Sequence, residues 1–254
     1  MRLDGRTALV TGAARGLGRS ISSVLAREGA GVVMADVDAE SVRQAATTIP
    51  NARAVHMDLR ERAAVSSTIE AVAETSGLDM LVNNAGFQRV APIAEFEEDD
   101  WIGIVETMLT GTFLCTKHAL PHLRRSSAGR VINIASVHGL VASPCKSAYV
   151  AAKHGIVGFT KSLALEEAGN GVTANAVCPG YIRTDLVESQ VSALAESNNV
   201  SAEAALEDIL LQPVPMKRLL EPEEVAELVA YIASDRASGI TGSAIPIDGG
   251  WTAQ

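Results

Sequence analysis

Short apolar runs alternate with longer amphipathic stretches along the first half of the chain. Strands of a parallel sheet that helices cover on both faces read as continuous apolar runs. Between the first two runs, Leu17, Ile21, Val24 and Leu25 recur at helical spacing, which gives one apolar stripe that can lie on the sheet. This pattern predicts strand, helix and strand in succession. The expected strands are residues 8–10, 32–35, 54–55, 80–82, 131–134 and 174–177.

Three longer stretches, 61–75, 101–123 and 147–165, are sparing of helix breakers and are expected to be helical. No internal repeat, low-complexity segment or linker divides the sequence. We therefore expect one domain over residues 1–254, an α/β fold of the doubly wound Rossmann-like kind with a parallel sheet of about seven strands.

The segment 185–215 interrupts this alternation with two short helical patterns. Ser197-Asn198-Asn199 separates them, and Ser201 is a suitable N-cap for the second. The segment follows the carboxyl end of a strand, which is where ligands lie in open parallel sheets. We interpret it as a helical lid over a substrate, the alternative being an ordinary surface excursion.

Composition narrows the choice of partner. Apolar residues make up 47% of the chain and the net charge is −9, with no run of Lys or Arg. We therefore do not expect nucleic acid or anionic membranes as partners, and we expect a small molecule instead. The sequence shows no apolar leader, no segment of membrane-spanning length and no disulfide or metal spacing among Cys115, Cys145 and Cys178. These features predict a cytoplasmic protein with reduced thiols.

A glycine-rich turn follows the first apolar run, at Thr11-Gly12-Ala13-Ala14-Arg15-Gly16-Leu17-Gly18. Glycines there permit a tight turn and let the backbone approach a pyrophosphate, whose charge the following helix N-terminus stabilises. The spacing Gly-x3-Gly-x-Gly is a weak signal alone, since a glycine-rich turn need bind nothing. The expected cofactor contacts from this turn are Gly12, Arg15, Gly16, Leu17 and Gly18.

The end of the second predicted strand carries Asp36, twenty residues after Gly16. A carboxylate at this place accepts hydrogen bonds from ribose hydroxyls and repels a 2′-phosphate, which favours NAD over NADP. Arg15 argues the other way, because a guanidinium can pair with that phosphate. Two further strand ends are placed near the same crevice: Asp58-Leu59, which could flank the adenine, and Asn84-Ala85-Gly86.

Three side chains supply chemistry for alcohol oxidation. Tyr149 and Lys153 stand four apart in a helical pattern and so share a face, and Ser136 follows the fifth apolar run. An alcohol that loses hydride must also lose its hydroxyl proton, and a phenol of ordinary pKa about 10 is a poor base at neutral pH. We expect Lys153 to lower the pKa of Tyr149 and to hold a ribose, and Ser136 to stabilise the developing alkoxide.

Taken in order, these motifs together with Pro179-Gly180 and Ile247-Asp248-Gly249-Gly250 resemble the short-chain dehydrogenase/reductase family over nearly the whole chain. The resemblance implies a seven-stranded Rossmann-like sheet, a nicotinamide cofactor that Tyr149 and Lys153 also contact, and a homotetramer. It also implies that Pro179, Gly180, Ile182 and Thr184 lie by the nicotinamide.

Within the family, the chain is most similar to the D-3-hydroxybutyrate dehydrogenases, on the stretches 86–88, 135–143, 146–149 and 190–196. This similarity implies a short anionic hydroxy or oxo acid as substrate, with its carboxylate held by Gln88, His138, Lys146 and Gln190, and Trp251 in the same region. Taken singly, Gln88, His138 and Lys146 could each be an ordinary loop or surface residue. Gln190 is harder to dismiss, because it falls among Val187, Val191 and Leu194 on the inward stripe of the predicted lid.

Two positions depart from the family pattern. Met108 stands where an Asn usually helps to hold a relay water, and Tyr181 stands where hydroxybutyrate dehydrogenases have Trp. A 3-oxoacyl-thioester reductase using NADPH is the alternative enzyme, which Asp36, Lys146 and Gln190 disfavour. An NAD-binding sensor without activity is a third hypothesis, and Met108 is its only support. No metal is assigned, since His56, His118, His122 and His154 show no ligand spacing.

Overall fold

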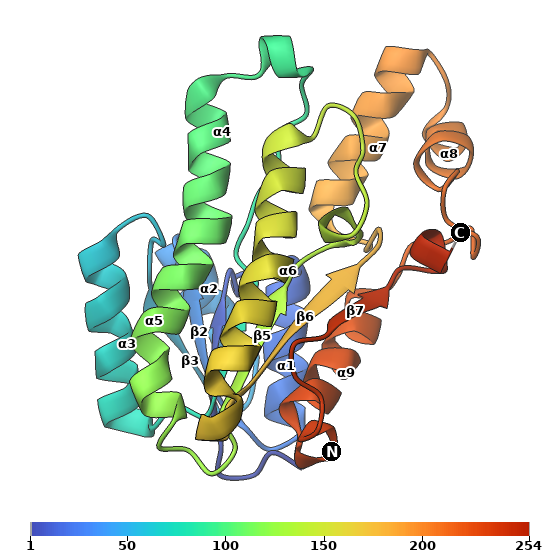
Figure 1. Cartoon of the computed structure of the whole chain (residues 1–254). Helices are drawn as coiled ribbons and strands as arrows, with labels where there is room; N and C mark the ends of the chain where they lie inside the picture. The colour runs from blue at the N-terminus through green and yellow to red at the C-terminus, as the bar shows by residue number, and fades with distance from the viewer. Residues whose placement is uncertain (1, 254) are drawn as a thin grey trace.

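The computed structural model describes residues 2–253, apart from the side chain of Leu186, and in this part of the chain seven parallel strands form one sheet (Figure 1). The strand order is β3-β2-β1-β4-β5-β6-β7, so the chain reverses direction across the sheet between β1 and β4. The strands are β1 (Thr7–Thr11), β2 (Gly31–Asp36), β3 (Ala52–His56), β4 (Met80–Asn83), β5 (Arg130–Ile134), β6 (Thr173–Pro179) and β7 (Ala244–Ile247).

Helices cover both faces of this sheet, each with its own apolar core. One layer consists of α1 (Gly16–Arg27), α2 (Ala39–Thr47) and α9 (Pro222–Ala233). The other consists of α3 (Arg62–Ser76), α5 (Gly111–Leu123) and α6 (Ser147–Glu167). Short 3-10 turns complete the connections at Ile93–Glu95, Val137–Gly139, Ala168–Asn170, Asp235–Ala237 and Trp251–Ala253.

The strands are mostly apolar because successive side chains enter different cores. In β1, Ala8 and Val10 belong to the core under α1 and α9, whereas Leu9 belongs to the core under α3 and α5. All three are fully buried. The expected α/β architecture is confirmed, and all six predicted strands are present; the pattern did not single out β7, whose residues are only partly buried.

The expected long helix at 101–123 begins earlier and is distorted in its middle. The chain forms α4 (Glu98–Val105), then a π-helical turn at Glu106–Thr110, and then α5 without a break. A π-helical turn widens the hydrogen-bond ladder by one residue, and such turns are frequent at functional sites. This one carries Met108, which is buried.

The segment after β6 forms the two predicted short helical elements. They are α7 (Asp185–Asn198) and α8 (Ala202–Ala204), which continues into the π-helical turn Ala205–Leu210. Asn199 ends α7 with a left-handed backbone at φ 52°, and the Ser201 hydroxyl caps α8 by accepting a hydrogen bond from Ala204 N, as predicted. Figure 1 shows α7 standing at the end of the sheet toward which β6 runs, above its carboxyl edge.

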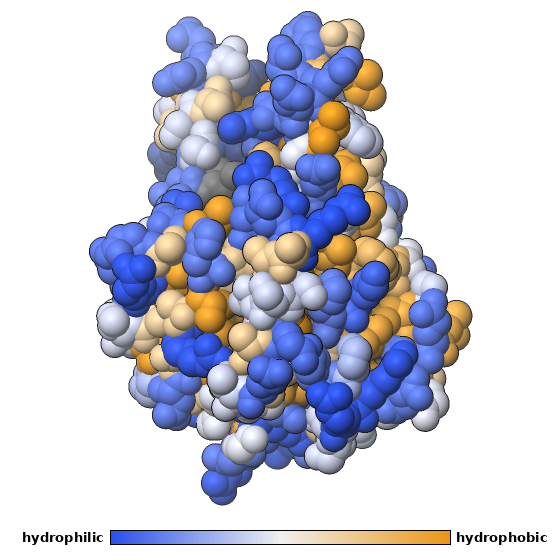
Figure 2. All heavy atoms as spheres, turned by 90° about the vertical axis from the view of Figure 1, so that its left-hand side faces the viewer, coloured by the Kyte–Doolittle hydropathy of each residue, from blue (hydrophilic) through white to orange (hydrophobic). Residues whose placement is uncertain are grey.

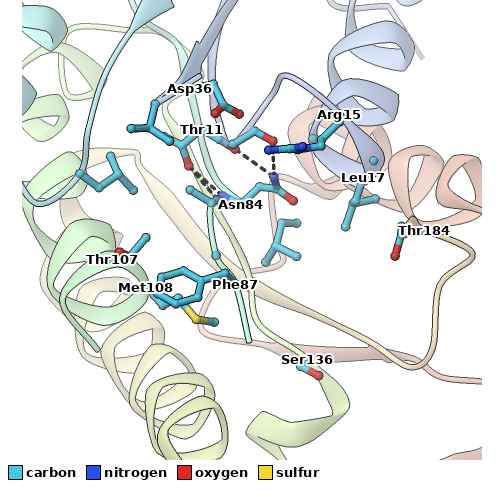
Figure 3. A pocket seen from close by; sticks show the side chains of 18 of the residues that line it. Thr11, Arg15, Leu17, Asp36, Asn84, Phe87, Thr107, Met108, Ser136 and Thr184 are labelled. Carbon is cyan, nitrogen blue, oxygen red and sulfur yellow. Dashed lines mark hydrogen bonds between the residues drawn. The ribbon is translucent and has the colours of Figure 1, made fainter. Parts of the chain in front are cut away.

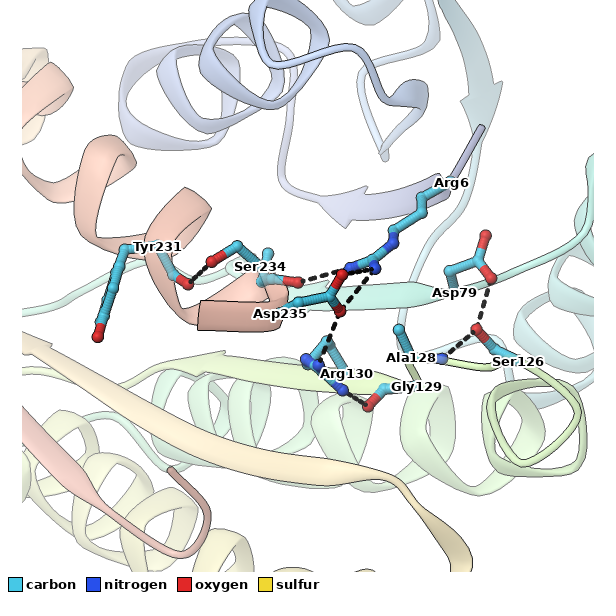
Figure 4. A network of polar contacts seen from close by, with 10 residues as sticks. Arg6, Asp79, Ser126, Ala128, Gly129, Arg130, Tyr231, Ser234 and Asp235 are labelled. Carbon is cyan, nitrogen blue, oxygen red and sulfur yellow. Dashed lines mark hydrogen bonds and ion pairs between the residues drawn. The ribbon is translucent and has the colours of Figure 1, made fainter. Parts of the chain in front are cut away.

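The opposite edge of the sheet is tied together by charge (Figure 4). Arg6, just before β1, donates two 2.7 Å hydrogen bonds to the Asp235 carboxylate, and Arg130, at the start of β5, lies 3.7 Å from the same group. The pKa of Asp235 is lowered chiefly by its hydrogen bond to Arg6. This network joins the turn after α9 to the amino ends of β1 and β5, at the edge of the sheet opposite the carboxyl ends of the strands.

Two further expectations concern thiols and membranes. Cys115 and Cys178 are fully buried and Cys145 is partly buried, and all three thiols are free. Among residues 2–253 no helix has the length and apolarity needed to cross a membrane.

Candidate active site

A cleft of about 740 Å³ opens at the carboxyl edge of the sheet, at the switch point between β1 and β4. Open α/β sheets bind their ligands at such a point, and the volume suits a dinucleotide with a small substrate. The structure brings all the predicted cofactor residues and all three predicted catalytic residues into the lining of this cleft. These are Gly12, Arg15, Gly16, Leu17, Gly18, Asp36, Asp58, Leu59, Asn84, Ala85, Gly86, Ser136, Tyr149, Lys153, Pro179, Gly180, Ile182 and Thr184.

The turn after β1 has room for backbone alone. Gly12 has φ 63°, and a Cβ on it would lie 2.7 Å from the Cα of Ala85. A Cβ on Gly18 would lie 2.1 Å from the carbonyl oxygen of Gly12. The exposed N-terminus of α1 at Gly16 therefore faces the cleft without side chains in front of it, which fits the pyrophosphate of a dinucleotide.

Asn84 holds this turn in place (Figure 3). Its side-chain amide donates to the carbonyl oxygens of Thr11 at 2.9 Å and Gly12 at 3.0 Å. The Thr11 hydroxyl in turn accepts hydrogen bonds from Asn84 N at 3.0 Å and Ala85 N at 3.1 Å. Asn84 thus acts by shaping the cleft across the β1–β4 junction, and its side-chain donors are occupied within the protein.

Asp36 and Arg15, which have opposite implications for the choice between NAD and NADP, lie at one end of the cleft. Asp36 is fixed by two backbone donors, Ala14 N and Asp38 N, each at 3.0 Å. Arg15 is exposed and lies at the same end, and Figure 3 shows both residues far from Ser136. Asp58 forms a bidentate ion pair with Arg60, which lowers the pKa of the Asp58 carboxyl.

The reacting end of the cleft contains Ser136, Tyr149 and Lys153. Ser136 follows β5, and its hydroxyl accepts a hydrogen bond from His138 N at 3.1 Å. Tyr149 and Lys153 occupy successive turns of α6, and the Lys153 ammonium is 5.5 Å from the centre of the Tyr149 ring. The same ammonium donates a 2.6 Å hydrogen bond to the carbonyl oxygen of Ile134.

One electrostatic expectation is corrected here. We expected Lys153 to lower the pKa of Tyr149. Instead, the burial of Tyr149 raises its pKa, and the hydrogen bond with Ser136 opposes that rise. The rise comes from the burial of Tyr149 itself, and the burial of Lys153 separately lowers the pKa of that ammonium to about 7. A lysine that is partly neutral near pH 7, with its charge directed at a backbone carbonyl, stabilises a phenolate less than a full ammonium does.

A cluster of rings lies beside Tyr149. The His138 ring is 6.1 Å from the Tyr149 ring and 5.4 Å from the Trp251 ring, and Trp251 is 5.1 Å from Tyr181. The Lys146 ammonium lies 5.4 Å from the centre of the Tyr181 ring. Lys146 and His138 are 9% and 3% exposed, so two of the four predicted substrate residues are buried side by side next to the reacting end.

Polar atoms of three predicted substrate residues lack protein partners. His138 Nδ1 in this cluster is buried without a hydrogen bond, and so is Gln88 Nε2, which no contact joins to the cluster among residues 2–253. The Lys146 ammonium lies against the Tyr181 ring and forms no ion pair or hydrogen bond within the same residues. Burial lowers the pKa of Lys146 and lowers that of His138 to about 4, so His138 is neutral at pH 7. Gln190 is half-buried on α7, and no contact joins it to this group within residues 2–253. Its role stays a prediction.

Met108 fills the place expected for a polar residue. Its side chain packs against Gly86, where a Cβ would lie 3.1 Å from the Met108 Cγ, and Figure 3 shows it beside Phe87. The helix backbone around Met108 is distorted into the π-helical turn at Glu106–Thr110.

Sequence reasoning missed several residues that line the cleft, among them Thr11, Arg60, Phe87, Thr107, Asp185 and Ser189. Thr11 carried a usable signal, since it follows directly on the predicted strand 8–10, and Arg60 follows directly on the predicted cofactor residues Asp58 and Leu59. Ser189 lies one residue before Gln190, on the helix that we expected to cover the substrate.

Comparisons with known proteins agree with this geometry. Residues 12–252 match a family model described as enoyl-(acyl carrier protein) reductase. The chain is 45% identical to the uncharacterized oxidoreductase YxjF of Bacillus subtilis, covering 98% of this chain and 99% of that protein. It is 42% identical to a D-beta-hydroxybutyrate dehydrogenase of Cupriavidus necator, covering 99% and 100%. The crystal structure of gox2181 superposes with a TM-score of 0.91 at 31% identity, covering 100% of this chain and 98% of that one.

Proposed function

Because the chain belongs to the short-chain dehydrogenase/reductase family of oxidoreductases, we propose that it interconverts a short 3-hydroxy acid and its 3-oxo acid with NAD, the pair being (R)-3-hydroxybutyrate and acetoacetate. The observation that carries the proposal is Lys146. It is buried beside the reacting end, and no carboxylate among residues 2–253 pairs with it. A buried ammonium is costly without an anion, and a substrate carboxylate would supply one.

Two other predicted substrate residues support the same ligand. Gln88 Nε2 and His138 Nδ1 are buried atoms without partners, and an amide donor and a neutral imidazole can both bond a carboxylate. A short acid has little apolar surface, so polar groups must provide most of its recognition. The ring of Tyr149 lies 6.1 Å from that of His138, which brings recognition and chemistry together.

In the proposed mechanism the cofactor supplies the hydride acceptor when bound. Tyr149 removes the hydroxyl proton of the substrate, and in the reverse direction it returns that proton to the oxygen. Ser136 hydrogen-bonds the same oxygen and stabilises its negative charge, while also lowering the pKa of Tyr149. Lys153 holds the ribose and, when protonated, favours the phenolate.

NAD is the proposed cofactor because Asp36 is held in the cleft by Ala14 N and Asp38 N. Its position is therefore fixed, and its charge would disfavour a 2′-phosphate. Arg15 is exposed, and no hydrogen bond within residues 2–253 fixes its guanidinium, so we assign it a smaller part in the choice of cofactor.

The experiment that tests this function is an absorbance assay for NADH with (R)- and (S)-3-hydroxybutyrate and their longer homologues. We expect turnover of the (R) form with NAD. Turnover only of acyl thioesters with NADPH would instead establish a 3-oxoacyl-thioester reductase, in keeping with the description of the matching family model. Binding of NAD without turnover of any alcohol would establish a sensor.

We also propose a homotetramer. The side of the molecule that Figure 2 shows carries apolar side chains among hydrophilic ones, and Trp101 and Ile102 of α4 and Phe113 of α5 are 40%, 48% and 45% exposed. Exposed large apolar residues of this kind mark contacts between subunits. Light scattering on the protein as it elutes from a size-exclusion column measures the mass of the assembly directly, and we expect four times the mass of one chain.

A further inference from the structure

The chain that follows β7 forms a turn that the proposed reaction does not use. Asp248 is buried there, and its carboxylate accepts hydrogen bonds from Gly250 N at 2.9 Å, from Thr252 N at 2.8 Å and from the Thr252 hydroxyl at 2.6 Å. Burial acts to raise the pKa of Asp248, but the hydrogen bonds that it accepts, led by that from the Thr252 side chain, keep the pKa below its ordinary value. The carboxylate is therefore ionised at neutral pH, where it accepts these bonds most strongly.

This turn presents the Trp251 side chain to the ring cluster beside the reacting end. The Trp251 ring lies edge-on to that of His138, with 5.4 Å between their centres and 85° between their planes, and its centre is 5.1 Å from that of Tyr181. The Lys146 ammonium lies 5.4 Å from the centre of the Tyr181 ring. Trp251 therefore packs against His138 directly and is joined to Lys146 through Tyr181.

The orientation of the His138 ring depends on this packing. Within residues 2–253 the ring forms no hydrogen bond, and its Nδ1 is buried without a partner. The aromatic rings that lie against it in the same part of the chain are Tyr149, at 6.1 Å, and Trp251, at 5.4 Å. Edge-to-face ring pairs have a preferred geometry. A displacement of Trp251 would therefore release the His138 ring on one side.

Asp248 is the side chain that fixes the end of the turn where Trp251 lies. Backbone hydrogen bonds hold the beginning of the turn, since Gly180 N donates to Ile247 O at 2.9 Å and Met216 N donates to Gly249 O at 3.1 Å. Beyond Trp251, both donors of Thr252 bond the Asp248 carboxylate. Loss of this carboxylate, or of the hydroxyl that it holds, would loosen the turn around Trp251.

We propose that Asp248 is a positioning residue for substrate recognition. Through the turn that its carboxylate caps, it holds the Trp251 ring against His138 and Tyr181, and so fixes the groups that bind the anionic end of the substrate. The nature of that end rests on the proposed function, whereas the hold on Trp251 does not. Asp248 therefore acts on KM for the substrate and leaves the proton transfer at Tyr149 unchanged.

The test compares Thr252→Val, which removes the hydroxyl but keeps the branched shape, with Thr252→Ser, which keeps the hydroxyl. All proteins carry Trp101→Phe, so that Trp251 is the only tryptophan. In Thr252→Val we expect acrylamide to quench the Trp251 fluorescence more strongly. KM for 3-hydroxybutyrate should rise about three- to tenfold, a range that one hydrogen bond can supply, with kcat and the Kd for NADH close to the parent values.

Three further variants complete the design. Thr252→Ser should match the parent in quenching and in KM. Asp248→Asn replaces an acceptor oxygen with an amide donor and should produce the same changes as Thr252→Val. Thr47→Val, at an exposed position on α2, is the matched control and should alter neither quantity.

The outcomes separate this inference from the proposed function. Parent-like quenching in Thr252→Val and Asp248→Asn, or stronger quenching with a parent-like KM, would overturn the role of Asp248 and leave the proposed function standing. Equal changes in Thr252→Ser or Thr47→Val would also overturn it. If the parent does not turn over 3-hydroxybutyrate, the proposed function fails, and quenching decides alone. An increase confined to Thr252→Val and Asp248→Asn would support the hold on Trp251, and no increase would overturn it.

Discussion

The Lys153 ammonium lies 5.5 Å from the centre of the Tyr149 ring, one turn further along the same helix. Lys153 is buried at this position. Burial lowers the pKa of Lys153 to about 7 from its ordinary 10.5, so the folded protein binds fewer protons than the unfolded chain between these two values. Stability therefore rises with pH across that window, and below it the full cost of the buried charge is present.

Lys153→Met removes this charge, and its effect on stability should depend on pH. We expect Lys153→Met to raise the free energy of unfolding by about 1–3 kcal/mol more at about pH 6 than at about pH 10, because at pH 10 the folded lysine is neutral and the cost of burying its charge has gone. Urea unfolding at the two pH values measures the difference. The lost hydrogen bond to Ile134 is common to both conditions and cancels. An equal change at both pH values would contradict the lowered pKa.

Asp36→Ala should narrow the preference for NAD. The wild-type protein should have the higher kcat/KM with NAD, because the carboxylate bonds a free ribose and repels a 2′-phosphate. In the variant, kcat/KM should rise with NADP and fall with NAD. Steady-state rates with both cofactors give the ratio, and Asp38→Ala, at a carboxylate that caps α2, is the control. Equal efficiency of the wild type with both cofactors would show that Arg15 governs the site.

Lys146→Ala should raise KM for 3-hydroxybutyrate about tenfold or more, since a charge-assisted hydrogen bond contributes about 1.5–3 kcal/mol. The affinity for NAD should change little. Lys161→Ala, on the exposed side of the same helix, is the control. Gln190→Ala should raise KM in the same direction if α7 closes over the carboxylate. Parent-like KM in both variants would mean that the substrate is a different secondary alcohol.

Met108→Asn should leave turnover within a few-fold of the parent. A thioether cannot donate and is a weak acceptor, so Met108 contributes packing against Gly86 and no proton relay. The π-helical turn at Glu106–Thr110 displaces backbone carbonyls, and we expect one of them to hold the relay water instead. The measurement is kcat together with its solvent isotope effect. A large rise in kcat with a smaller isotope effect would show that the relay is impaired in the parent.

The sequence predicted the sheet well because a parallel strand buried on both faces is apolar at most of its positions. Val131 and Ile132 of β5 enter different cores, and this requirement is visible without a structure. The cofactor turn was predicted equally well, because Gly12 and Gly18 occupy positions where a Cβ cannot fit and glycine is required. Motifs at the ends of predicted strands therefore identified most of the residues that line the cleft.

Features that depend on tertiary burial were not predictable in this way. The local pattern around 101–123 is helical, and nothing in it reveals the π-helical turn that the chain adopts there. The raised pKa of Tyr149 and the lowered pKa of Lys153 likewise follow from how deeply each side chain is buried, which spacing along α6 does not disclose. The ring cluster joins His138, Tyr181 and Trp251 from three distant segments, and only the fold brings their side chains together.

The central claim is that Tyr149 transfers the proton, and Tyr149→Phe tests it most directly. The change removes one oxygen and leaves Lys153 and the glycine turn in place. With NAD and 3-hydroxybutyrate, we expect kcat to fall by about a hundredfold to ten-thousandfold, the usual contribution of general acid–base catalysis. The Kd for NADH, measured by fluorescence titration, should stay close to that of the parent. A variant that keeps near-parental kcat would contradict the account.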